Sequence, residues 1–310
     1  MHSYLRSAAV LPAAALLIAC LSCGGGNIII NPPQLTGHLY LGTFDAPAKL
    51  LQFSLPLDSM STPAMTVTNA TLTDTAAIAV DSNGNVATAD FSGNIAVFNA
   101  PFGSSAPATF KNGSATNTGQ LAFNSAGDLF ATTVSGTVNV FTHPLTSAST
   151  PSQVVSNINL LTTVGAVIDS SGNLIIANSH GPSGSNLVAL APPYNGLPFV
   201  TPVVPGASYR QMAVSGSVLF VVNSVLGASR VDVYDLPINA GSHPAFSITG
   251  GIFNAPRSPQ SVALDVAGNL YVGDVSNASI NVYTPPLSSA STPSLTLSVS
   301  HGSQGMAIGK

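Results

Sequence analysis

The sequence contains no glutamate and no tryptophan, and charged residues make up only 6% of its 310 positions. An average soluble domain has about 25% charged residues. Because long soluble helices draw on Glu, Lys and Arg, this composition argues against a helical protein. The hydrophobic fraction is 45%, and Ser, Thr, Asn, Gly and Pro are plentiful. Such a composition is typical of a globular chain built from strands and turns.

Cations are too few and too scattered for a nucleic-acid-binding protein. Seven Lys and Arg residues are spread over the chain, and the net charge is −4. Nucleic-acid binding depends on clustered cations that neutralise phosphates. We therefore expect no nucleic-acid partner, and for the same reason no direct binding to an anionic membrane surface.

The N-terminal residues have the features of an export signal. Arg6 supplies a positive charge, and the apolar stretch from Ala8 to Ala19 that follows is shorter than the roughly 20 residues of a membrane span. The stretch ends in Leu17-Ile18-Ala19-Cys20, which resembles the lipobox of bacterial lipoproteins. In that family the cysteine becomes the new N-terminus and carries the lipid, a part that would fall to Cys20 here.

We accordingly predict a signal peptide over residues 1–19, Cys20 as a lipid anchor, a flexible tether over 20–36 and a folded domain over 37–310. Cys23 as the anchor, a plain secretory signal and a Cys20–Cys23 disulfide are alternatives. The protein is expected to be exported, as a membrane-anchored lipoprotein of the bacterial cell envelope or as a secreted protein if it is not lipidated. Since no other cysteine exists, the domain has no disulfide framework and no thiolate chemistry.

A repeated unit organises the rest of the chain. Its clearest copy, Val262 to Pro286, reads VALDVAGNLYVGDVSNASINVYTPP. Leading apolar triplets begin at residues 78, 121, 166, 212 and 262, so the spacings are 43, 45, 46 and 50 residues. A period of about 40–50 residues with four strands per unit is typical of propeller blades.

Turn residues recur at a fixed place in each unit. Asp81, Asp169 and Asp265 each lie three residues before a glycine. In hairpin turns an Asp side chain bonds the backbone two residues on, and Gly adopts positive φ. This pattern predicts a tight turn between the first two strands of each unit.

The two ends of the domain complete the count. Residues 38–67 contain strands two to four of a unit without a leading triplet, whereas residues 305–310 form a leading triplet with no strands after it. Joining these ends removes exposed sheet edges. We therefore predict an all-β, six-bladed β-propeller of four-stranded blades, closed by pairing of the C-terminal strand with the N-terminal blade.

The units resemble the NHL repeat, whose pattern runs as an apolar pair, D-x-x-G-N, Y-V-A-D, a polar loop and I-x-V-F. Val262 to Tyr283 matches this pattern almost throughout, and the unit at Ile78 also matches well. The unit at Met212 has lost its turn Asp. The resemblance covers residues 38–310 and is specific for fold rather than function.

No catalytic or nucleotide-binding motif is evident. The sequence has no G-x-S-x-G elbow, no phosphate-binding loop and no clustered histidines. His143 and His243 each precede a proline at the end of a third strand, which predicts exposed turn residues. We expect no catalytic residues.

Candidate binding residues lie at the ends of the second strands. In propellers of this kind ligand sites usually lie where the loops between strands two and three meet the channel. The second-strand ends form a predicted ring of polar residues, here called the polar ring: Thr43, Asp90, Thr133, Asn178, Asn223 and Asp274. The candidate binding residues are Asp90, Asn178, His180, Asn223, Arg257, Asp274 and His301, with Tyr209 and Arg210 on nearby loops.

Two interpretations of the polar ring are open. Asp and Asn at such positions often bond the backbone of the loop that follows. Alternatively their oxygens could bind a small ligand or a divalent cation such as calcium. No other cofactor is indicated.

Enzymes exist among propellers similar to this one, namely lactonases, amidating lyases and streptogramin lyases. The positions that match lactonase metal ligands include Arg210-Gln211, Gln260-Ser261 and Gln304-Gly305, and no carboxylate is among them. The chain also lacks the glutamate that lactonases and streptogramin lyases use. We therefore expect a monomeric, non-catalytic binding or scaffolding protein with a protein or small-molecule partner, and keep a metal-dependent hydrolase or lyase as the alternative.

Overall fold

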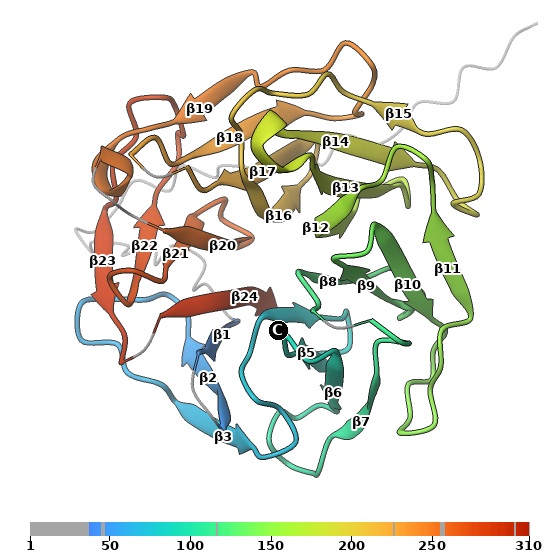
Figure 1. Cartoon of the computed structure of the whole chain (residues 1–310). Coiled ribbons are helices and arrows are strands. Elements are labelled where there is room, and N and C mark those ends of the chain that lie inside the picture. The colour runs from blue at the N-terminus through green and yellow to red at the C-terminus, as the bar shows by residue number, and fades with distance from the viewer. Residues whose placement is uncertain are drawn as a thin grey trace, which may run out of the picture. The chain divides into compact units, whose positions relative to one another are not determined.

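A computed structural model describes residues 37–44, 47–115, 117–225, 227–254, 258–300 and 302–309. Its described residues form six sheets of four antiparallel strands, arranged as blades around a central channel (Figure 1). The predicted all-β six-bladed propeller is therefore confirmed. None of the described helices is long and apolar enough to span a membrane.

The first three blades run from the N-terminal strands to residue 156. Blade one contains β1 (His38–Thr43), β2 (Ala48–Ser54), β3 (Met65–Asn69) and the C-terminal β24 (Ser303–Gly309). Blade two contains β4 (Ala77–Val80), β5 (Val86–Ala89), β6 (Asn94–Phe98) and β7 (Ala108–Lys111). Blade three contains β8 (Leu121–Phe123), β9 (Leu129–Thr133), β10 (Thr137–Phe141) and β11 (Gln153–Ser156).

The other three blades repeat the order from the channel outward. Blade four contains β12 (Thr162–Ile168), β13 (Leu174–Ser179), β14 (Ser185–Leu190) and β15 (Phe199–Val200). Blade five contains β16 (Tyr209–Ser215), β17 (Val218–Asn223), β18 (Arg230–Asp235) and β19 (Phe246–Ile248). Blade six contains β20 (Pro259–Leu264), β21 (Leu270–Asp274), β22 (Ser279–Tyr283) and β23 (Leu295–Ser298). Two 3-10 turns, η1 (Gly181–Ser183) and η2 (Gly251–Asn254), lie in the loops.

Ring closure follows the prediction. β24 pairs antiparallel with β1, with Leu39 opposite Ile308 and Leu41 opposite Met306. Blade one is thus built from both ends of the domain, and its innermost strand comes from the C-terminus (Figure 1).

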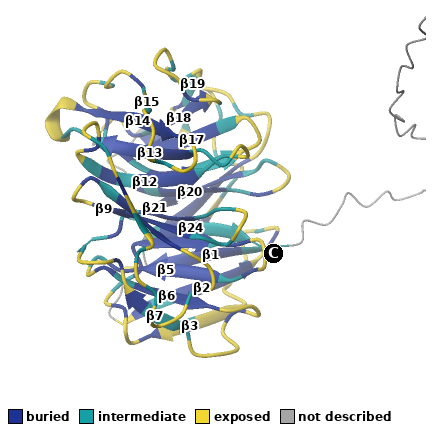
Figure 2. Cartoon of the chain, turned by 90° about the vertical axis from the view of Figure 1, so that its right-hand side faces the viewer, coloured by how far each residue is buried: buried dark blue, intermediate teal, exposed yellow. Residues whose placement is uncertain are grey.

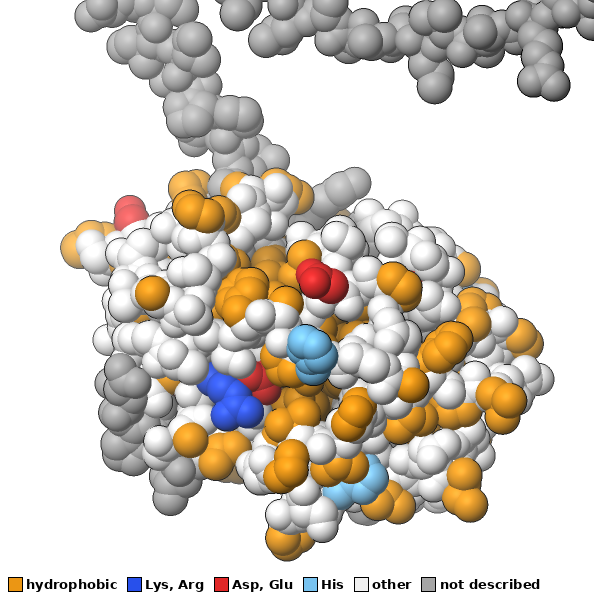
Figure 3. All heavy atoms as spheres, turned by 90° about the horizontal axis from the view of Figure 1, so that it is seen from above, with side chains coloured by type: hydrophobic (Ala, Val, Ile, Leu, Met, Phe, Trp, Pro, Cys, Tyr) orange, Lys and Arg blue, Asp and Glu red, His pale blue; other side chains and the backbone are white. Residues whose placement is uncertain are grey.

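The core lies between the blades. Six clusters of buried apolar residues each draw their members from two neighbouring blades, and one of them joins blade six to blade one. Seen from the side, the inner strands are buried and the loops at the two ends are exposed (Figure 2). Seen from above, charged side chains are few on the surface and lie among polar and apolar ones (Figure 3). Burial of apolar surface, worth about 25 cal/mol per Å², therefore stabilises every blade against both of its neighbours.

The predicted turns are formed as expected. The Asp265 carboxylate accepts hydrogen bonds from the backbone N–H groups of Ala267 and Asn269, each at 2.9 Å, and Gly268 has a φ of 82°. Blade three uses Asn124 in place of the aspartate, and its side-chain amide donates to Asp128 at 2.9 Å. The two residue types have exchanged places without loss of the turn.

Candidate functional site

The polar ring is buried in the structure. Its six members are at most 1% exposed: Thr43, Asp90, Thr133, Asn178, Asn223 and Asp274. Asp90 accepts bonds from the backbone N–H of Asn94 at 2.7 Å and from that of Thr73 at 3.2 Å. Asp274 accepts bonds from the backbone N–H groups of Ser276 at 3.0 Å and Ser258 at 3.3 Å. These carboxylates hold adjoining loops, as the first of the two interpretations predicts.

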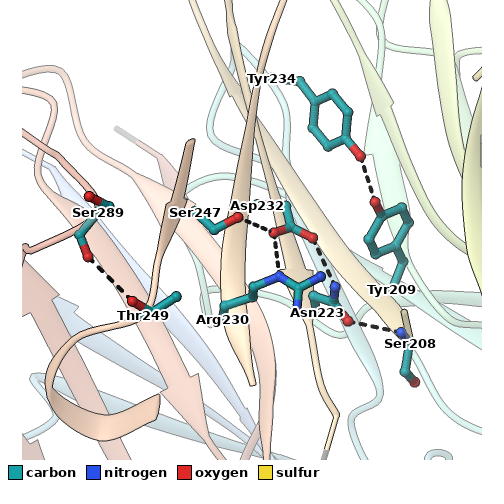
Figure 4. Close-up of polar contacts among 9 residues, drawn as sticks. All are labelled: Ser208, Tyr209, Asn223, Arg230, Asp232, Tyr234, Ser247, Thr249 and Ser289. Carbon is teal, nitrogen blue, oxygen red and sulfur yellow. Dashed lines mark hydrogen bonds and ion pairs between the residues drawn. The ribbon is translucent and has the colours of Figure 1, made fainter. Parts of the chain in front are cut away.

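Two further ring members lie in side-chain clusters of their own blades. In blade four, Asn178 and His180 both contact Asn186: the Asn178 amide donates at 3.0 Å, and His180 Nε2 lies 3.0 Å from the same oxygen. In blade five, the Asn223 amide donates to Asp232 at 2.8 Å (Figure 4). Of the predicted residues, Asn178 and His180 therefore lie together in blade four, whereas Asn223 belongs to a separate cluster in blade five.

The remaining predicted residues are untested by these contacts. Arg257 and His301 lie outside the described residues, as does the predicted anchor Cys20. Within the described ranges, no group of three or more His, Cys, Asp or Glu side chains is placed to hold a metal ion. A calcium-binding role for Asp90 and Asp274 stays a prediction.

Two glutamine side chains cross the central channel. The side-chain oxygen Oε1 of Gln120 accepts bonds from the backbone N–H groups of Ala166 and Met212, each at 3.0 Å. The side-chain amide of Gln120 donates to the backbone carbonyl oxygen of Met212 at 2.7 Å. Gln211 donates to the carbonyl oxygens of Ala76 at 3.0 Å and Gly119 at 3.4 Å. Inner strands of four blades are therefore tied to one another by side chains inside the channel.

Each of these glutamines lines a different cavity. One, of about 220 Å³, is lined by the leading triplets of all six blades and by Gln120. The other, of about 150 Å³, is here called the channel-mouth cavity and includes Gln211 in its wall. No lining residue is shared between the two. The described lining of the channel-mouth cavity is Ala76, Phe91, Asn117, Gly119, Val134, Thr163, Val164, Arg210, Gln211, Gln260 and Gln304.

β-Bulges supply much of this lining. In four sheets the register between the inner strand and its neighbour shifts by a residue, and the displaced inner-strand residues are Val164, Arg210 with Gln211, Gln260 and Gln304. A bulge breaks the ladder locally and re-aims a side chain, and bulges are frequent beside functional sites. The same device therefore acts in four blades to point side chains into one cavity.

Arg210 is the cation of the cavity. Burial lowers the pKa of its guanidinium from the ordinary value, and its Nε is buried without a hydrogen-bond partner among the described residues. No carboxylate appears in the described lining. The described lining therefore combines one cation with several side-chain amides.

Apolar side chains also belong to the cavity lining or lie next to it. Phe91 and Val134 directly follow the polar-ring positions of blades two and three, and both line the cavity. Phe44 occupies the same position in blade one, is 56% exposed and packs edge-on against Phe91 with ring centroids 6.1 Å apart. A ligand in the cavity would therefore meet both polar and apolar side chains.

The sequence predicts a site at the polar ring, whereas the cavity is lined by other residues near that ring. Arg210, Gln260 and Gln304 stand at positions compared with lactonase metal ligands, but a bulge leaves no clear mark in the spacing of apolar residues. The polar-ring residues precede the loops as predicted, yet their side chains are buried and none of them lines the channel-mouth cavity.

Comparison with known proteins defines the fold alone. No protein-family model matches the chain, and no curated protein matches it. A protein of unknown function from Desulfotomaculum acetoxidans is 15% identical, with a TM-score of 0.60 over 90% of each chain.

Two further solved structures are similar to the same degree. The WD40 repeats of RRP9 are 14% identical, with a TM-score of 0.60 over 90% of this chain and 85% of that one. A candidate 6-phosphogluconolactonase from Bacteroides uniformis is 13% identical, with a TM-score of 0.59 over 87% of this chain and 85% of that one. At these identities the likeness establishes a β-propeller, and function has to be argued from the site.

Proposed function

We propose that this chain is a non-catalytic binding or scaffolding β-propeller of the bacterial cell envelope, which recognises a protein or a small ligand through the channel-mouth face. The observation that carries the proposal is the channel-mouth cavity, whose described lining offers Arg210 and side-chain amides but no carboxylate. Amides and a guanidinium form directional hydrogen bonds, but they do not change their protonation state near neutral pH and so are poor general acids and bases. Such a lining suits recognition rather than general acid–base chemistry.

The propeller is of an NHL-like rather than a WD40 type in this proposal. Supporting it, three blades share the Asp–Gly turn, in which the aspartate accepts two backbone N–H bonds. The chain contains no tryptophan, so the Trp-Asp dipeptide that marks WD40 blades cannot occur.

The envelope location rests on the lipobox-like Leu17-Ile18-Ala19-Cys20. Replacing the cysteine (Cys20→Ser) is expected to move the protein from the detergent phase to the aqueous phase, or to leave it uncleaved. A wild-type protein that partitions into water and shows an unmodified N-terminus by mass spectrometry would rule the anchor out.

A pull-down with matched variants tests the binding role. All six sheets lie within residues 38–309, so residues 27–310 retain the whole ring and serve as bait. A specific partner should be retained by the wild type and by Leu197→Ser, which alters a 96% exposed side chain outside the cavity. The double variant Arg210→Met with Gln304→Ala should lose it. Equal retention by all three baits would place recognition elsewhere.

The alternative is a metal-dependent hydrolase or lyase that uses the polar ring. Its support is the fold shared with the candidate 6-phosphogluconolactonase and the two ring carboxylates, Asp90 and Asp274. It requires that calcium raise the melting temperature, that chelator reverse the rise, and that Asp90→Asn with Asp274→Asn abolish it. Calcium-dependent hydrolysis of a gluconolactone by the wild type, absent from that variant, would favour this enzyme over the binding role.

A further inference from the structure

We propose that the channel-mouth cavity binds the carboxylate group of a small organic acid, with Arg210 as its counter-ion and with Phe91 and Val134 against its apolar part. The inference rests on the proposed binding function and names the class of ligand. It starts from a difference between two arginines of blade five.

Arg230 and Arg210 have opposite surroundings. Arg230, on β18, donates to Asp232 at 2.6 Å, and that carboxylate also accepts bonds from Asn223 and Ser247 (Figure 4). Arg210, on β16, forms no ion pair with any described residue, and its Nε is buried without a bond. A guanidinium stays charged at all physiological pH values, so this side chain holds an unpaired charge partly out of water.

An unpaired, partly buried cation costs free energy that an oxyanion can offset. Isolated charges are buried in proteins chiefly when they are paired. The planar guanidinium donates in a fork that matches the two oxygens of a carboxylate. No residue in the described part of the fold pairs with Arg210 in this way, and a bound carboxylate would supply such a partner.

Further donors converge on the same cavity. The side-chain amides of Gln304 and Asn117 line it and have no hydrogen bond to another described residue. The Gln260 amide donates to Ser258 at 2.8 Å, which fixes its side chain beside the cavity. Because Arg210, Gln260 and Gln304 are all placed by β-bulges, their convergence comes from the same local distortion in three separate blades.

The volume of the cavity and the charge of its described lining restrict the class of ligand. A volume of about 150 Å³ is close to that of an apolar cavity known to hold benzene, so it admits a small acid or one end of a larger one. Arg210, the one cation of the described lining, matches a single negative charge. Asp74 accepts a bond from the backbone N–H of Phe91, a lining residue, at 3.1 Å, and its negative charge would repel a phosphate dianion more strongly than a carboxylate monoanion. Phe91 and Val134 favour an apolar body next to the charged group.

Benzoate is a suitable probe, and benzamide is its neutral counterpart of the same shape. Both are titrated by calorimetry into the wild-type protein, with inorganic phosphate as a third arm. Arg210→Met keeps the volume of the side chain and removes its charge, whereas Arg210→Lys keeps the charge. Arg230→Met serves as a control for loss of an arginine outside the cavity.

The wild type should bind benzoate and raise its melting temperature with benzoate concentration, and it should bind benzamide and phosphate at least about tenfold more weakly. Arg210→Met should lose benzoate binding at least tenfold, Arg210→Lys should retain the preference for benzoate over benzamide, and Arg230→Met should bind benzoate as the wild type does. Without ligand, Arg210→Met should melt at or above the wild-type temperature, since it removes an unpaired charge.

Three outcomes would overturn the inference: no benzoate binding by the wild type, binding of benzamide or phosphate as tight as that of benzoate, or a ligand-free Arg210→Met that melts several degrees below the wild type. In any of these cases, if the double variant Arg210→Met with Gln304→Ala still fails to retain the pull-down partner, the binding function stands and only the ligand class is wrong. If that partner is retained as well, both fail.

Discussion

Gln211 donates a hydrogen bond to the carbonyl oxygen of Ala76 at 3.0 Å, although the two residues lie 135 positions apart in the sequence. The bond joins blade five to blade two, on the opposite side of the ring. Apolar packing holds each blade only to its neighbours, so side-chain bonds through the channel provide a second kind of connection. Its contribution to stability is measurable.

Replacing Gln120 by leucine should destabilise the domain more than a glutamine change elsewhere. Gln120→Leu removes three bonds and leaves the N–H groups of Ala166 and Met212 without their side-chain partner. At about 1–3 kcal/mol for each buried unsatisfied group, the free energy of unfolding should fall by roughly 3 kcal/mol in a urea titration. The control is Gln153→Leu on the outer strand β11, which removes one bond from the Gln153 side chain to the Pro193 carbonyl oxygen. This change should cost under about 1 kcal/mol. An equal fall in the free energy of unfolding of both variants would mean that the bonds in the channel stabilise the domain no more than a single bond of an outer strand.

Gly165 makes room for this crossing side chain. A Cβ atom there would lie 2.5 Å from the Arg210 carbonyl oxygen and 3.0 Å from the Gln120 side-chain oxygen. Gly165→Ala should therefore push the inner strands of blades four and five apart and lower the melting temperature by several degrees. Gly196→Ala is the matched control, because a Cβ there meets no atom within 4 Å, and it should be neutral or slightly stabilising. A Gly165→Ala protein as stable as the control would show that the contact is relieved without cost.

Buried tyrosines should make the domain sensitive to alkali. Burial raises the pKa of the phenols of Tyr209, Tyr271 and Tyr283, and raises that of Tyr234 to about 12. In the unfolded chain a tyrosine loses its proton near pH 10, while the native state keeps it to higher pH. The stabilisation is therefore fully present below pH 10 and is lost as pH rises through the native pKa values, at about 1.4 kcal/mol per pH unit for each tyrosine.

Tyr283→Phe separates this effect from packing. The Tyr283 hydroxyl is buried without a hydrogen-bond partner among the described residues, so its removal should raise the free energy of unfolding by about 1 kcal/mol at pH 7. The variant should also lose stability less steeply above pH 10. Tyr271→Phe, in contrast, removes a 2.9 Å bond to Asp265 and should destabilise at pH 7. Destabilisation of both variants alike would contradict the assignment of Tyr283 as unpartnered.

How far the sequence predicts this protein can be seen from particular residues. The leading triplets, together with a turn such as that of Asp265 in blades two, four and six, predict strands one and two of those blades, because local turn chemistry and apolar alternation leave few other structures. Asp90 and Asp274 were correctly placed at second-strand ends, but whether their oxygens face a loop or the channel depends on contacts with residues far along the chain. The Arg210 cavity depends on bulges and on Gln120 bonds to residues 46 and 92 positions away, for which a single sequence carries no local signal.

Ring closure offers the most direct test of the architecture. β24 supplies the innermost strand of blade one, and Met306 on it is 3% exposed and packs in one cluster with Leu39 and Leu41. Deleting residues 303–310 leaves the β1 edge open and its apolar side chains uncovered. Burial of Met306 alone is worth about 1.5–3 kcal/mol, and loss of the β24 ladder adds to it, against a total stability of about 5–15 kcal/mol for a typical domain.

The truncated protein should therefore melt many degrees lower than the parent and should aggregate through the freed edge. Deletion of residues 27–34, which removes the same number of residues before the first strand, is the matched control and should leave both the melting temperature and the monomer fraction unchanged. Calorimetry and size-exclusion chromatography on the two deletions decide the matter. If loss of β24 shifts the melting temperature by no more than a degree or two and the protein stays monomeric, the β1–β24 pairing does not hold the ring together, and its stability has to come from the packing between blades alone.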